Sequence, residues 1–91
     1  MGMFDYFVIH EKFLPDGHKV PIENQSFQTK SLECYLDVFE VKEDGKLLRT
    51  DGKHNLTQEY NYTGEIRFYG LKFEFVAWVV EGIVKEVILI K

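Results

Sequence analysis

The clearest pattern of hydrophobic and polar positions lies in the last third of the chain. Residues 65–69, 72–80 and 83–90 are rich in β-branched and aromatic residues, and Gly70 and Gly82 interrupt them. Glycine accepts the positive φ angles that tight turns require, so glycine between such runs is typical of hairpins. The pattern therefore predicts an antiparallel three-stranded meander at the C-terminal end.

The middle run of this meander is hydrophobic on both of its alternating faces. Its odd positions are Phe73, Phe75, Ala77 and Val79, and its even positions are Glu74, Val76, Trp78 and Val80. Such a strand is typical of the centre of a sheet covered on both sides, or of a surface through which two molecules associate. From this apolar surplus we expect a homodimer.

A second alternation falls within residues 27–48, FQTKSLECYLDVFEVKEDGKLL. Its period of two predicts a strand whose buried face carries Leu32, Cys34 and Leu36. The apolar phase slips by one residue after Val38, and such a slip exchanges the two faces of a strand. We therefore expect a bulge near Asp37 or Val38, or a second covered face. The Asp44-Gly45 pair that follows predicts a tight hairpin turn.

Shorter runs complete the set of predicted strands. They cover residues 6–13, 27–30, 46–50 and 55–60, with turns predicted at residues 14–17 and 51–53. Residues 18–23 contain Pro21, which lacks a backbone donor and restricts that segment to an edge strand or a loop. No run has the length and period of a helix. The fold expected for residues 1–91 is a single all-β domain, a small antiparallel sandwich or half-open barrel.

The charge balance narrows the classes of partner. Fifteen acidic and eleven basic residues give a net charge of −4, which does not suit direct nucleic-acid binding because that requires a basic patch. An acidic protein can instead bind a basic partner protein. The chain shows no apolar run long enough for a signal peptide or a membrane span, so we expect an intracellular, soluble protein.

The residues that could carry chemistry are few. The single cysteine, Cys34, is expected to be a small buried hydrophobe because no cationic residue flanks it. His10, His18 and His54 each lie near a carboxylate in sequence, but none has the spacing of a metal-ligand pair. With no nucleophile motif and no phosphate-binding loop, we expect no enzyme activity, no cofactor and no metal. A metal-assisted hydrolase using these histidines is the least favoured alternative.

Binding residues are easier to nominate. Aromatic side chains opposite buried positions can serve as recognition anchors, and Arg67 among them could stack on a ring or pair with an anion; the candidates are Tyr35, Tyr62, Arg67, Tyr69 and Trp78. The alternative is that the tyrosines border the core with a hydrated hydroxyl. Several acids could form a stripe for a basic partner, or simply a solvated face: Glu33, Asp37, Glu40, Glu43 and Asp44. From this stripe Asp37 and Glu40 are the nominated binding residues.

Several segments resemble a family of small uncharacterised proteins of tailed bacteriophages and prophages. The resemblance rests on MGMFD at residues 1–5, Leu-Pro-Asp at residues 14–16, FQTK at residues 27–30, the Leu-x-Cys-x-Leu-Asp segment at residues 32–37, DGKL at residues 44–47 and TGEIRFY at residues 63–69. It implies an accessory phage protein acting in the cytoplasm of a bacterial host, and it supplies no catalytic residues. Similar sequences with a Cys-Pro-x-Cys segment look zinc-binding, but this chain has Leu14-Pro15-Asp16-Gly17 at that place and lacks the cysteines.

Two function classes follow from these features. The first is a non-catalytic interaction module that binds a host or phage protein through an aromatic and acidic sheet surface, as an inhibitor of a host process. The second is a small-molecule module in which Tyr62, Arg67, Tyr69 and Trp78 line a cleft for a nucleotide-like anion.

Overall fold

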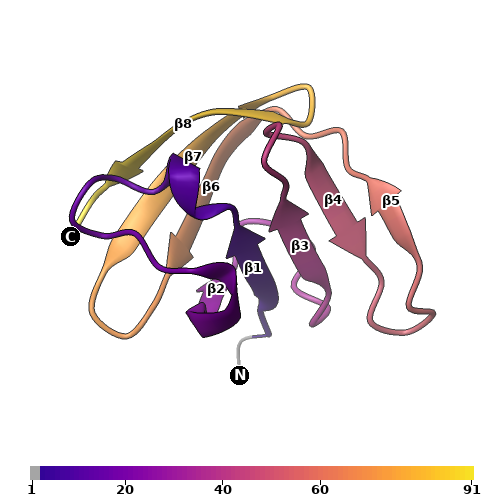
Figure 1. The fold of residues 1–91 in the computed structure, drawn as a ribbon. Helices are drawn as coiled ribbons and strands as arrows, with labels where there is room; N and C mark the ends of the chain where they lie inside the picture. Colours follow the sequence, from indigo (N-terminus) through magenta and orange to yellow (C-terminus); the bar gives the residue numbers. More distant parts are fainter. Residues whose placement is uncertain (1–2) are drawn as a thin grey trace.

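A single mixed β-sheet forms the whole framework of the protein. The computed structural model describes residues 3–91, so Met1 and Gly2 of the MGMFD segment lie outside the described residues. Eight strands pair in the order β5-β4-β3-β1-β2-β6-β7-β8 (Figure 1). Their bounds are β1 Asp5–Ile9, β2 Phe27–Thr29, β3 Val38–Val41, β4 Leu47–Thr50, β5 Thr57–Glu59, β6 Gly64–Tyr69, β7 Glu74–Val80 and β8 Ile83–Leu89. The all-β prediction is confirmed, and the only helical turns in residues 3–91 are the 3-10 turns η1 Glu11–Phe13 and η2 Ile22–Asn24.

Strand β1 lies at the centre of the sheet and joins its two halves. It pairs antiparallel with β2 and parallel with β3, and every other strand pair is antiparallel. The parallel pair arises because residues 31–37 return the chain to the other side of β1 before β3 begins. The predicted meander is present as β6, β7 and β8.

The sheet curls until its β3–β4 turn meets its β7–β8 turn (Figure 1). Lys46 bridges to Ile83, Leu47 N–H donates to the carbonyl of Gly82 at 2.8 Å, and Val84 N–H donates to the carbonyl of Gly45 at 2.8 Å. The described residues thus form one curled sheet joined at one end, the half-open barrel of the two expected architectures.

The inner, concave face of the sheet carries the hydrophobic core. The core side chains come from seven of the strands and from Leu14: Phe7, Ile9, Leu14, Phe27, Phe39, Val41, Leu47, Ile66, Phe68, Phe75, Ala77, Val79 and Val84. Phe68 stacks between Phe7 and Phe75, at centroid distances of 4.5 and 5.2 Å. Residues 10–26 cross the concave side as a covering segment that includes η1 and η2 (Figure 1).

The strand predicted over residues 32–37 is wrong. These residues form a loop in which Cys34 and Leu36 have φ angles of 63° and 62°. The buried carboxylate of Asp5 organises it by accepting the backbone N–H groups of Cys34, Tyr35 and Asp37 at 2.7, 3.0 and 3.0 Å. These three bonds satisfy the loop backbone locally, so it has no need of a strand partner.

Two further predictions for this segment are also wrong, the burial of Cys34 and the bulge near Val38. Cys34 is half-buried rather than part of the core, with Sγ 3.4 Å from the carbonyl oxygen of Lys30. The change of phase near Val38 marks the start of β3 and not a bulge, while the register shift of the sheet lies between Trp78 and Val79 on β7.

The hairpin turn predicted at Asp44-Gly45 is present in the structure. Asp44-Gly45 closes the β3–β4 hairpin, with Gly45 at φ 91° and its N–H donating to the carbonyl of Lys42 at 2.9 Å. Residues 18–23 form loop and the start of η2 rather than a return strand, as Pro21 allows. None of residues 3–91 belongs to a helix with the length and hydropathy needed to cross a membrane.

Candidate functional site

The outer, convex face of the meander presents a tryptophan between two glutamates. In the antiparallel register Glu65 of β6 lies opposite Trp78 of β7, and Trp78 lies opposite Glu86 of β8. Directly paired residues point to the same face of a sheet, with Cβ atoms about 4.5–5.5 Å apart. Both carboxylates therefore flank the indole on the outer face.

Two aliphatic side chains extend this surface along the strands. Val76 and Ile88 form the neighbouring pair of the β7–β8 register, and with the three residues above they line a shallow depression of about 290 Å³. Trp78 is 49% exposed and Ile88 is 48% exposed. We call Glu65, Val76, Trp78, Glu86 and Ile88 the outer-face site.

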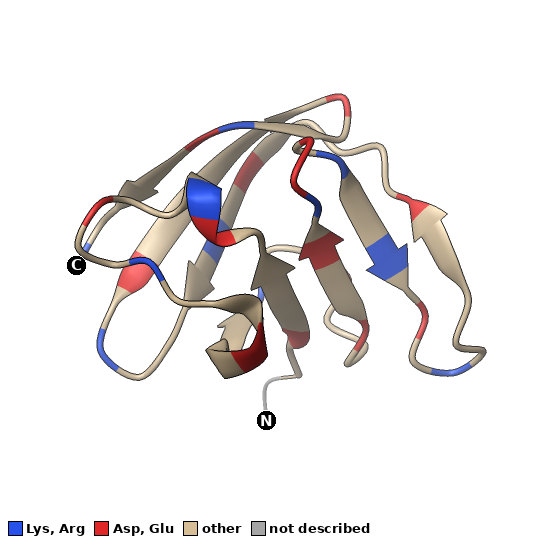
Figure 2. Ribbon diagram, viewed as in Figure 1, with Lys and Arg blue, Asp and Glu red and all other residues tan. Residues whose placement is uncertain are grey.

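The outer-face site is acidic. Among residues 3–91, neither Glu65 nor Glu86 takes part in a salt bridge, whereas neighbouring Arg67 lies 3.4 Å from Glu74. Figure 2 shows acidic positions on both strands that flank β7. Carboxylates beside an exposed indole attract a cation, because the face of the ring and the two charges are all negative.

Three of the nominated binding residues share this face. Arg67 pairs with Val76 in the register, and Tyr69 pairs with Glu74, so Arg67, Tyr69 and Trp78 all point outward. Tyr62 does not join them, since its ring packs against the core and its hydroxyl donates to the carbonyl of Glu65 at 2.8 Å. The four residues expected to line one cleft are therefore divided between two environments.

Asp37 occupies a structural position. It is 2% exposed, and its Oδ2 lies 2.6 Å from a terminal guanidinium nitrogen of Arg49 and accepts from Arg49 Nε at 2.8 Å. Its Oδ1 accepts the N–H of Gly52 at 3.0 Å. The hydrogen bond to Asp37 raises the pKa of Arg49 above its ordinary value, against the opposing effect of desolvation. The carboxylate of Asp37 is thus committed to joining β3, β4 and the turn after β4.

The remaining acids of the predicted stripe lie apart. Glu33 accepts the hydroxyl of Tyr60 at 2.6 Å, and Glu40 on the outer face of β3 pairs with Lys42 at 3.4 Å. Burial, then the hydrogen bond to Glu33, raises the pKa of Tyr60 to about 12. Asp44 accepts the N–H of Lys46 inside the hairpin turn. Tyr35 is 66% exposed in the 31–37 loop.

The histidines do not converge. His10 Nδ1 accepts from Lys12 N–H, His54 contacts Asp51 at 3.1 Å, and His18 packs edge-to-face on Phe73. No cluster of three His, Cys, Asp or Glu side chains suited to a metal ion occurs in residues 3–91. The three histidine–carboxylate neighbours seen in sequence thus serve separate local contacts.

Sequence reasoning missed Glu65 and Glu86, and the sequence carries a signal for only the first of them. Glu65 stands in the polar phase of its run, whereas Glu86 shares its phase with the apolar residues Val84, Ile88 and Ile90. Regular pairing from the turn at Gly82 would place Lys85 opposite Trp78. Glu86 lies there because the register shifts between Trp78 and Val79, which the sequence pattern does not reveal.

Comparisons of the chain with protein-family models, with curated proteins and with solved structures found no match. The class that the fold and the site define is an all-β protein with an exposed aromatic and acidic surface on a half-open barrel. Its function is argued from that surface.

Proposed function

We propose that this protein is a non-catalytic interaction module that binds a partner protein through the outer-face site. The observation that carries the proposal is the placement of exposed Trp78 between Glu65 and Glu86, with the two aliphatic neighbours beside it. Tryptophan is among the residues that most often dominate binding energy at protein interfaces. The partner is a protein that presents an arginine or lysine side chain next to an apolar contact.

The chemistry of the site supports a cationic anchor. A guanidinium over the indole gains about 0.5–1 kcal/mol at an exposed position, and the two carboxylates add charge-assisted hydrogen bonds. The aliphatic pair Val76 and Ile88 offers a contact for the apolar stem of the same side chain. An anionic ligand would instead be repelled by both glutamates, so the nucleotide-like alternative is not favoured at this face.

The setting of this module follows from the sequence resemblance. We propose a phage or prophage accessory protein that acts in the cytoplasm of a bacterial host, where it inhibits a host process by occupying a basic surface of a host or phage protein. The net charge of −4 favours such a partner by long-range attraction.

The test is a comparison of bait proteins rather than a single capture. Wild-type protein, Trp78→Ala and Tyr35→Ala are immobilised at equal density and exposed to the same bacterial lysate. Tyr35 is the matched control because it is an aromatic residue with 66% exposure in the 31–37 loop. We expect a specific partner to be retained by wild type and Tyr35→Ala, and its affinity to fall roughly 30-fold with Trp78→Ala. Equal retention by all three baits would refute a role for the outer-face site.

A further inference from the structure

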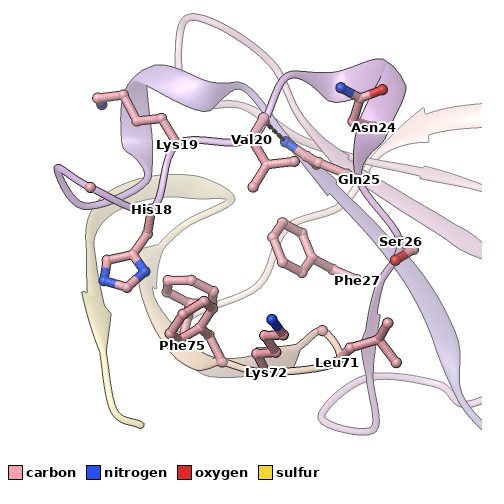
Figure 3. A pocket seen from close by; sticks show the side chains of 13 residues that line it. His18, Lys19, Val20, Asn24, Gln25, Ser26, Phe27, Leu71, Lys72 and Phe75 are labelled. Carbon is pink, nitrogen blue, oxygen red and sulfur yellow. Dashed lines mark hydrogen bonds between the residues drawn. The ribbon is translucent and has the colours of Figure 1, made fainter.

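A second cavity lies on the opposite side of the meander, beneath the segment that covers the core. It has a volume of about 360 Å³ and lies between residues 17–27 and the β6–β7 turn at residues 70–73 (Figure 3). Small-molecule sites in proteins commonly have volumes of roughly 300–1,000 Å³. This cavity is therefore at the small end of the range, with the volume of about twelve water molecules.

The walls of this cavity are aromatic and aliphatic. The ring of Phe27 points into it, Val20 lies above, and Phe75 lies at its base (Figure 3). Phe27 and Phe75 meet edge-to-face at 5.7 Å with their planes 75° apart, so the two rings form an apolar corner against which a third ring can pack. A planar hydrocarbon body fits these walls.

Some polar side chains of the cavity already form hydrogen bonds within the protein, and others have no such partner. Lys19 Nζ donates to the carbonyl of Leu14 at 2.9 Å, and the side-chain amide of Gln25 donates to the carbonyls of Ile9 and Val20 at 2.6 and 2.8 Å. Both side chains thus brace the covering segment. Neither is free to recognise a ligand.

The polar side chains left over are His18, Asn24, Ser26 and Lys72, and His18 and Lys72 carry the argument. His18 Nδ1 is buried without a hydrogen-bond partner in residues 3–91, while its ring is held edge-to-face 4.5 Å from Phe73 and 6.2 Å from Phe75. Lys72 lies across the cavity from Val20 (Figure 3) and forms no salt bridge with any described residue. A buried polar atom without a partner is costly, so a ligand that accepts from His18 would recover that cost.

We propose that this cavity binds a small aromatic carboxylate. The ring lies against Phe27 and Phe75, and the carboxylate accepts from His18 Nδ1–H and pairs with the ammonium of Lys72. The site is distinct from the outer-face site, because Phe75 points to the inner face of β7 while Trp78 points to the outer face. The ammonium of Lys72 also distinguishes it from the acidic outer-face site, so the two sites select ligands of opposite charge.

The test is a protein-observed NMR titration with phenylacetate and its uncharged analogue phenylacetamide. We expect phenylacetate to give saturable shifts confined to the backbone amides of residues 17–20 and 70–73. Phenylacetamide should bind at least about fivefold more weakly, since a charge-assisted hydrogen bond exceeds a neutral one. Lys72→Met should reduce this preference, whereas Lys53→Met, at an exposed turn position, should leave it unchanged.

Three outcomes would overturn the proposal. They are the absence of local saturable shifts, equal affinity for the acid and the amide, or an unchanged preference in Lys72→Met. His18→Phe provides a second check, because it preserves the edge-to-face packing and removes the donor. It should weaken phenylacetate binding more than phenylacetamide binding, because the carboxylate loses the stronger hydrogen bond.

Discussion

At the scale of single residues, two buried carboxylates determine how the middle of the chain is arranged. Asp5 accepts three backbone N–H groups of the 31–37 loop, and Asp37 joins Arg49 and Gly52. Both are nearly inaccessible, at 0% and 2% exposed. A buried carboxylate is tolerated when its oxygens are satisfied: Asp5 accepts three backbone N–H groups, and Asp37 adds an ion pair with Arg49 to its hydrogen bonds.

Replacing Asp37 should therefore destabilise the protein strongly. We expect Asp37→Ala to lower the free energy of unfolding by about 2–3 kcal/mol, because it leaves the N–H of Gly52 and the inner side of Arg49 without a partner. The measurement is denaturant unfolding followed by circular dichroism. Glu40→Ala on the neighbouring β3 position is the matched control and should change the value by less than about 0.5 kcal/mol. Similar midpoints for the two variants would contradict this account.

Tyr60 should ionise at a higher pH than an ordinary tyrosine. Burial and then the Glu33 hydrogen bond raise its pKa from 10.0 to about 12, which means that the folded state favours the neutral phenol. The resulting stabilisation is complete below pH 10 and is lost as the pH rises from 10 through 12. An absorbance titration of tyrosinate should resolve this late step, and Glu33→Gln should move it to lower pH. A single step near the ordinary value for all tyrosines in the folded protein would refute it.

At the scale of elements, the sequence predicted the C-terminal half of the sheet well. Residues 65–69, 72–80 and 83–90 correspond to β6, β7 and β8, because the β-branched and aromatic residues of each run form a paired strand between turns. The Asp44-Gly45 turn was equally clear, since local backbone chemistry sets it.

The same alternation failed in residues 32–37 for a physical reason. That loop is held by the side chain of Asp5, about thirty positions earlier, and no local pattern reveals such a distant contact. The parallel β1–β3 pair was missed for the same cause, because it depends on how the loop carries the chain across β1. The outer-face site was half predicted: Trp78 was nominated from its phase, whereas its two glutamates required the register across strands.

The β7–β8 turn is the element on which closure of the sheet depends. Gly82 has φ 77°, its carbonyl accepts from Leu47 N–H, and a Cβ at this position would lie 2.8 Å from the carbonyl oxygen of Tyr60. No side chain fits that space without moving backbone. Gly82 is therefore expected to be intolerant of substitution.

Alanine substitutions at two glycines separate backbone strain from this clash. Gly17 has φ 84° but open space around its Cβ position, so Gly17→Ala should cost only about 1 kcal/mol of unfolding free energy. Gly82→Ala carries the same strain plus the clash, and should cost about 3 kcal/mol. Thermal or denaturant unfolding of both variants measures the difference. Equal losses would show that the approach of the Tyr60 carbonyl to the β7–β8 turn is not tight.

At the scale of the whole molecule, the curled sheet divides the protein into an inner face that holds the core and an outer face that presents polar and aromatic groups. The curl brings the ends of β4 and β8 together, while the rest of β8 remains at the edge of the sheet. An edge strand with hydrophobic residues readily pairs with another chain. Exposed Leu89 and Ile90 lie at and just beyond the end of β8.

We expect this edge to make the protein a homodimer. Pairing of two β8 edges leaves Trp78 accessible, so self-association and partner binding are compatible. Light scattering at high concentration should give a particle of twice the 10.8 kDa chain mass. A particle with the mass of one chain over the whole concentration range would contradict the dimer.

The central claim is that the outer-face site binds a cationic side chain, and the single tryptophan of the chain makes it directly measurable. We propose a fluorescence titration of Trp78 with a tetra-arginine peptide, with a tetra-citrulline peptide as the uncharged control. The account predicts a saturable, salt-sensitive change with tetra-arginine only. The change should be lost in Glu65→Gln/Glu86→Gln and retained in Glu11→Gln/Glu23→Gln, which removes the same charge from the covering segment. No saturable change with tetra-arginine, or an equal response of both double variants, would contradict the account.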